Sequence, residues 1–93
     1  MSDKVQYHAI VHGRVQGVFF RAETAKAAGK FNITGWVRNL TDGSVEAVIE
    51  GEEENVQQMI QWIETGPPLA SVADVQWEKN LSPSGFTDFK ITR

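Results

Sequence analysis

Residues 34–63, TGWVRNLTDGSVEAVIEGEEENVQQMIQWI, hold the patterns that decide the fold. Two runs rich in β-branched and aromatic residues, at 34–40 and 44–50, flank Thr41-Asp42-Gly43, a combination typical of a β-hairpin. Four apolar residues then recur at the spacing of one helical face: Val56, Met59, Ile60 and Ile63. Gly66 and the two prolines after it end this helical pattern. The stretch therefore predicts a β-hairpin followed directly by an amphipathic helix.

The chain on either side of this stretch supplies further strands and one more helix. Residues 4–12 alternate between polar and apolar, which indicates a half-buried strand, and two glycines within 13–17 break it into a loop. The alanine-rich segment 21–30 favours a helix. Beyond the second helix, residues 72–77 alternate again. A last short strand holds three apolar residues: Phe86, Phe89 and Ile91.

The resulting order is β-α-β-β-α-β with a short final strand. We therefore expect an α+β fold, a ferredoxin-like α/β sandwich in which two helices cover one face of an antiparallel sheet. A chain of 93 residues has the size of one domain, so we expect a single domain over residues 1–93. This fold carries many unrelated functions, so the function has to be argued from a site.

Composition excludes several kinds of chemistry. The chain has no cysteine, which rules out disulfides, thiolate metal sites and a cysteine nucleophile. Its two histidines, His8 and His12, stand in no metal-binding pattern, so we predict no metal and no cofactor. The net charge is −3, which gives no general attraction to nucleic acid. The N-terminal residues lack a long apolar run, so we expect a cytoplasmic protein that does not enter membranes.

The segment 13–21, GRVQGVFFR, carries the most chemical information. Gly13 and Gly17 allow a left-handed backbone, and a turn of successive amides that leads into a helix forms a cradle for anions. Arg21 follows, and its planar guanidinium can bind two phosphate oxygens at once. A tight strand-to-helix turn with a solvated arginine gives the same pattern. The fingerprints of nucleotide-binding loops are absent.

Two motifs resemble those of the acylphosphatase family. Residues 11–21, VHGRVQGVFFR, are similar to its first signature, and residues 35–45, GWVRNLTDGSV, followed by Gly51, are similar to its second. The resemblance extends over nearly the whole chain, because the predicted order of strands and helices fits the family. It implies hydrolysis of acyl phosphates to a carboxylate and inorganic phosphate by a small, metal-independent and usually monomeric enzyme.

The resemblance also implies roles for individual residues. Arg21 would bind the phosphoryl group, Asn39 would hold the attacking water, and Thr41 would support Asn39. The amides of the loop before Arg21 would bind substrate and, as product and inhibitor, inorganic phosphate: Val15, Gln16, Gly17, Val18, Phe19 and Phe20.

Two other functions remain open at this stage. The first is a catalytically silent or accessory anion-binding module of the same fold. The second is nucleic-acid binding through the sheet, which the acidic balance and the carboxylates Glu46 and Glu50 disfavour. The three tryptophans are predicted to be packing residues, although the first of them could touch substrate: Trp36, Trp62 and Trp77.

Overall fold

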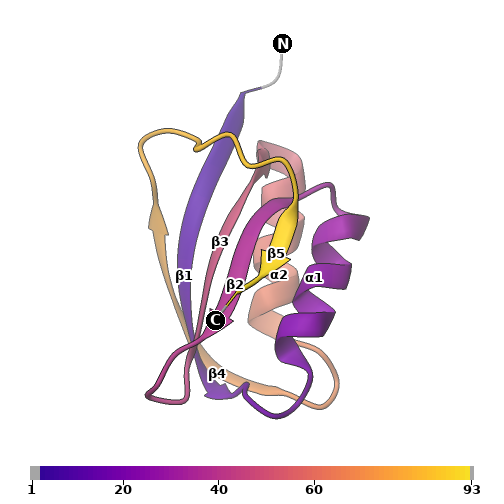
Figure 1. The fold of residues 1–93 in the computed structure, drawn as a ribbon, viewed down its shortest axis with the longest axis vertical. Coiled ribbons are helices and arrows are strands. Elements are labelled where there is room, and N and C mark those ends of the chain that lie inside the picture. Colours follow the sequence, from indigo (N-terminus) through magenta and orange to yellow (C-terminus); the bar gives the residue numbers. More distant parts are fainter. Residues whose placement is uncertain (1–2, 93) are drawn as a thin grey trace.

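The computed structural model describes residues 3–92, in which two helices cover one face of a five-stranded sheet (Figure 1). The elements in chain order are β1 Lys4–Arg14, α1 Phe20–Lys30, β2 Thr34–Asn39, β3 Val45–Glu52, α2 Glu53–Thr65, β4 Ser71–Lys79 and β5 Phe89–Ile91. The predicted fold class is confirmed, with most boundaries within two residues of those expected from the sequence.

The sheet has the order β4-β1-β3-β2-β5 and is mixed rather than wholly antiparallel. The first four strands pair antiparallel, but β5 pairs parallel with β2, with Gly35 opposite Phe89. The reason lies in the connection after β4, which crosses the end of the sheet where β4 finishes and β2 begins (Figure 1). A strand that starts there runs in the same direction as β2.

The strand β1 continues two residues beyond the predicted end, through a bulge at Gly13. The register with β4 shifts between His12 and Gly13, and Gly13 has a φ of 127°. A Cβ there would lie 2.2 Å from the carbonyl oxygen of Ser71, so no other residue fits without a shift of the backbone. The bulge turns the chain away from β4 toward the first helix.

The core lies between the sheet and the two helices. The predicted stripe of α2 faces it, with Val56, Met59 and Ile63 fully buried, against strand residues such as Val37 and Ile49. The helix α1 buries small residues, Ala27 and Ala28, which let it lie close to the sheet. No helix within residues 3–92 has the length and apolarity needed to cross a membrane.

The tryptophans pack in two different ways. Trp62 packs against Phe20 with ring centroids 6.1 Å apart, and Trp77 meets Tyr7 edge to face at 6.2 Å. Trp36 lies on the sheet face away from the helices, where the Arg38 guanidinium stacks 5.4 Å from its ring. Trp36 does not line the cavity described below.

Candidate active site

The loop between β1 and α1 has an unusual backbone. Gly17 has a φ of 74°, and Phe19, the residue that caps α1, has a φ of 63°. A left-handed conformation is easy for glycine but costs a phenylalanine free energy, because its Cβ crowds the backbone. The Phe19 side chain is also 70% exposed, so burial does not compensate this cost. Such a residue is typical of a functional loop.

The amides of this loop have no acceptor within residues 3–92. The first amide of the region with a partner is that of Glu23, which donates to the carbonyl of Phe19 at 2.9 Å. None of the amides of residues 16–22 donates to a backbone or side-chain oxygen of the described chain. They include the first turn of α1, where the helix dipole adds partial positive charge. The loop is therefore a cradle of free donors suited to an anion.

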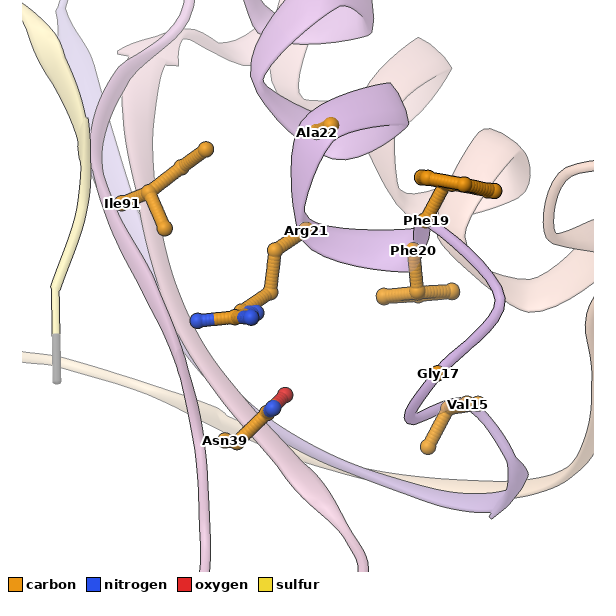
Figure 2. A pocket seen from close by; sticks show the side chains of 8 residues that line it. All are labelled: Val15, Gly17, Phe19, Phe20, Arg21, Ala22, Asn39 and Ile91. Carbon is orange, nitrogen blue, oxygen red and sulfur yellow. The ribbon is translucent and has the colours of Figure 1, made fainter.

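A cavity of about 330 Å³ opens beside these donors. Its walls come from the loop, the first turn of α1 and the ends of β2 and β5: Val15, Gly17, Phe19, Phe20, Arg21, Ala22, Asn39 and Ile91. Figure 2 shows the Arg21 guanidinium reaching from α1 toward the amide group of Asn39, with the loop on the other side of the cavity. The Arg21 guanidinium and the loop that carries the unpaired amides thus border one cavity.

Asn39 is the last residue of β2, and pairing with Val45 of β3 fixes its backbone. Its Oδ1 atom is buried and has no hydrogen-bond partner within the described residues. Buried polar atoms are nearly always paired in folded proteins, so an unpaired acceptor that faces a cavity indicates a ligand or a bound water.

The side chain of Gln16 connects the loop to the β2–β3 turn. Its Nε2 donates to the carbonyl oxygens of Leu40 and Ser44, both at 2.8 Å. Asp42 stabilises that turn by accepting from the Ser44 amide at 2.9 Å, and hydrogen bonds from the Ser44 hydroxyl and amide lower the pKa of the Asp42 carboxyl. The cradle and the strand that carries Asn39 are therefore held together directly.

The structure brings most of the predicted site residues together, but not all of them. Six line the cavity: Val15, Gly17, Phe19, Phe20, Arg21 and Asn39. Gln16 turns its side chain to the hairpin, Val18 is buried, and Thr41 is exposed in the β2–β3 turn and outside the cavity lining. The roles of all nine residues toward substrate stay predictions.

Sequence reasoning missed two residues of the cavity, Ala22 and Ile91. Ala22 follows Arg21 on the first turn of α1, and a helical projection could have found it. Ile91 reaches the cavity only because β5 pairs parallel with β2, and the local sequence pattern does not predict that pairing. Within residues 3–92 no group of three or more histidine, aspartate or glutamate side chains is arranged to hold a metal ion.

A loop of free amides, a guanidinium and an unpaired amide oxygen around one cavity are groups suited to a protein that binds phosphoryl groups. The family model described as acylphosphatase matches residues 7–91. Acylphosphatases from Thermococcus kodakarensis and Pelotomaculum thermopropionicum are 49% and 46% identical to this chain, each over 95% of it and 96% of the relative. A crystal structure of an acylphosphatase from Bacillus subtilis has a TM-score of 0.92 at 38% identity, over 96% of this chain and 99% of that one.

The chain belongs to the acylphosphatase family. This membership confirms the prediction of an acylphosphatase that the two sequence motifs made.

Proposed function

We propose that the cavity between residues 15–22 and Asn39 is the active site in which this protein hydrolyses the carboxyl–phosphate bond of acyl phosphates. The observation that carries this assignment is the convergence of three kinds of group on one cavity. These are the unpartnered loop amides, the Arg21 guanidinium and the buried, unpaired Oδ1 of Asn39.

The phosphoryl group binds in the cradle. The loop amides donate to its oxygens, and the N-terminal end of α1 adds favourable charge. Arg21 supplies two N–H groups in a fixed plane, which match two phosphate oxygens. Phosphoryl transfer depends mainly on positioning and on stabilisation of charge, and this arrangement provides both.

Asn39 positions the water. Its Oδ1 accepts a hydrogen bond from one O–H of the water, which directs an oxygen lone pair at phosphorus. A neutral amide does this without the repulsion that a carboxylate would exert on the phosphate dianion. The position of Asn39 across the cavity from the loop suits an attack in line with the breaking bond.

The reaction needs no general acid. As the water oxygen bonds to phosphorus, the bond from phosphorus to the acyl oxygen breaks and its electron pair leaves with the carboxylate. The conjugate acid of that carboxylate has a pKa near ~4, so the carboxylate departs unprotonated. Both water protons stay with the phosphate, so an acyl phosphate dianion and water give a carboxylate and dihydrogen phosphate.

The first test is hydrolysis of acetyl phosphate in the presence of excess chelator, with inorganic phosphate as inhibitor. We expect turnover to survive chelation and phosphate to inhibit competitively, because it presents the same oxygens to the same cradle. A catalytically silent anion-binding module would bind phosphate without turnover. Noncompetitive inhibition would place the anion site elsewhere and contradict the assignment of the loop.

The second test separates the two side chains. Arg21→Gln should weaken phosphate affinity about 10- to 100-fold, because it removes a charged donor pair. Asn39→Ala should keep phosphate affinity and lower turnover about 10²–10³-fold, because the water loses its positioning group. Arg38→Gln is the matched charge control, since Arg38 pairs with Glu46 outside the cavity.

The measurements are phosphate titration and initial rates on each folded variant. If Asn39→Ala loses phosphate affinity but keeps its turnover number, Asn39 contacts the phosphate and the role in positioning water is wrong. If Arg38→Gln weakens phosphate binding as much as Arg21→Gln does, general charge rather than the cradle explains the affinity.

We also propose a single-domain, monomeric enzyme that acts in the cytoplasm. The one contiguous core of the described chain supports the single domain, and the resemblance to a family of usually monomeric enzymes supports the monomer. Light scattering on the purified protein tests the monomer, and cell fractionation tests the location.

A further inference from the structure

A second hollow adjoins the active site. It has a volume of about 280 Å³ and lies between the start of α1 and the α2–β4 loop, lined by Val18, Phe19, Glu23, Pro67, Pro68 and Leu69. Phe19 belongs to the walls of both hollows, so the two adjoin at this side chain. Apart from Glu23, every residue in the lining is apolar. We call this hollow the acyl groove.

Exposed large apolar side chains line both the cavity and the acyl groove. Four large apolar residues within 3–92 are exposed, and three of them line the cavity or the groove: Phe19, Leu69 and Ile91. Phe19 and Leu69 are 70% and 66% exposed, and both line the acyl groove. An apolar cluster left open beside a polar cradle is typical of a ligand site.

The position of Phe19 is a second reason to expect a ligand at the groove. It occupies the residue before α1, where polar side chains that accept from the helix amides are preferred, and it makes no such hydrogen bond. It does so in a left-handed conformation that asparagine or glycine adopts more readily. A bulky apolar side chain at a strained and exposed position is explained by what it contacts outside the fold.

The side from which the leaving group departs also favours the groove as the place of the acyl group. In an in-line displacement the leaving group departs on the side of phosphorus opposite the attacking water. Asn39 and Phe19 lie on opposite sides of the cavity (Figure 2). If Asn39 holds the water, as proposed above, the acyl group leaves toward Phe19 and the groove behind it.

We propose that the acyl groove binds the acyl part of the substrate and selects for apolar acyl groups. A ring or branched chain would bury apolar surface against Phe19, Leu69 and Pro67. Glu23 places its carboxylate in the wall, whereas its ion-pair partner Lys26, 3.8 Å away, lies outside the lining, so the groove disfavours acyl groups that carry a second carboxylate. This inference rests on the proposed function of the neighbouring cavity.

The experiment compares kcat/KM for benzoyl, acetyl and succinyl phosphate in the unchanged protein and in variants. We expect benzoyl phosphate to be preferred over acetyl phosphate about tenfold, and succinyl phosphate to be the poorest. Leu69→Ser should reduce the benzoyl-to-acetyl ratio about fivefold, while inhibition by inorganic phosphate keeps its strength. Phe19→Asn, which suits the left-handed backbone, should reduce the same ratio.

Leu81→Ser is the matched control, because Leu81 is an exposed leucine outside the groove. It should leave the ratio unchanged. The inference is overturned if the unchanged protein shows no preference for benzoyl phosphate, or if Leu69→Ser and Phe19→Asn keep the full ratio. Those outcomes leave the proposed function intact, whereas a protein that hydrolyses none of the three substrates overturns the proposed function itself.

Discussion

Two loops of this molecule contain runs of successive backbone amides, and the two runs differ in what accepts from them. In residues 84–86 the amides of Ser84, Gly85 and Phe86 donate to the Glu50 carboxylate at 2.7, 3.0 and 3.2 Å. In residues 16–22 no oxygen of the described chain accepts from the amides. Both loops contain a left-handed glycine, with a φ of 74° at Gly17 and 82° at Gly85.

The presence or absence of an internal acceptor distinguishes a structural loop from a loop available to bind a ligand. Glu50 is fully buried and also accepts from Nε2 of Gln6 at 2.8 Å, so it acts as an internal anion that ties the 80–88 loop to the sheet. Burial alone would raise the pKa of Glu50, but hydrogen bonds from the Ser84 amide, Gln6 and the next amides lower it overall, which keeps the carboxylate charged. The loop at 16–22 has no such internal anion, and that leaves its donors to a substrate.

The largest effect should come from removing the internal anion. Glu50→Ala should lower the free energy of unfolding by about 3 kcal/mol or more, because it leaves three amides and Gln6 without their acceptor. Glu50→Gln keeps one acceptor oxygen and should lose less. Urea denaturation measures both variants.

The Glu50→Ala variant also allows a rescue experiment. Formate should stabilise Glu50→Ala more than the unchanged protein, because a small carboxylate can replace the missing one. Phosphate affinity at the cradle should not change in either variant, since Glu50 lies outside the cavity lining. If Glu50→Ala is as stable as the unchanged protein, successive amides need no anion here and the comparison fails.

A smaller effect is expected from acid. The pKa of Glu50 is lowered as described, and that of Glu46 is lowered because hydrogen bonds from His8 and Arg38 outweigh its burial. A carboxyl whose pKa is lower in the folded state stabilises the fold at pH values above its unfolded pKa, near 4.5. This stabilisation is lost as the pH falls from there through the lower folded value, where the folded carboxylates take up protons.

Urea midpoints measured from about pH 7 to about pH 3 test this expectation. The unchanged protein should lose stability progressively in the acid range, and Glu50→Gln should show a shallower slope. Equal slopes in the two proteins would mean that Glu50 keeps its ordinary pKa in the folded state.

The smallest effect concerns the link between the cradle and Asn39. Gln16→Ala removes both hydrogen bonds to the β2–β3 turn, which should lower turnover about tenfold, or ~1.4 kcal/mol in the barrier. Phosphate affinity should change little, because the loop amides remain. Gln57→Ala, which removes an exposed glutamine on α2, is the control for initial rates. A full turnover number in Gln16→Ala would show that the loop and the turn hold their positions independently.

The sequence predicted those parts of the fold that depend on local patterns. The β2–β3 hairpin and α2 followed from turn residues and from the spacing of Val56, Met59 and Ile63. The parallel pairing of β5 could not be predicted in this way, because it depends on where the 80–88 loop crosses the sheet. The alternation around Phe89 gives a strand but not its partner.

Residues of the candidate site were likewise predictable only where a local motif marked them. Arg21 and Asn39 followed from motifs, and the structure brings both to one cavity. Gln16 was expected to contribute its amide, and nothing local predicts that its side chain bridges to Leu40. Glu50 stands in an acidic run that suggests a solvated surface, and its burial depends on a loop more than thirty residues away, at Ser84.

The order of the sheet also has a consequence for the time at which activity arises. The cradle follows β1 and Asn39 ends β2, yet β3 lies between these two strands in the sheet. The two halves of the site therefore meet only after residues 45–52 have paired with both strands. The pairing of β3 with β2 is a local hairpin, but the pairing of β3 with β1 joins segments distant along the chain. Folds dominated by such pairs form in milliseconds to seconds rather than microseconds. We therefore expect recovery of hydrolysis during refolding to report the joining of β1, β3 and β2, and a chain still emerging from the ribosome to be inactive until β3 is in place.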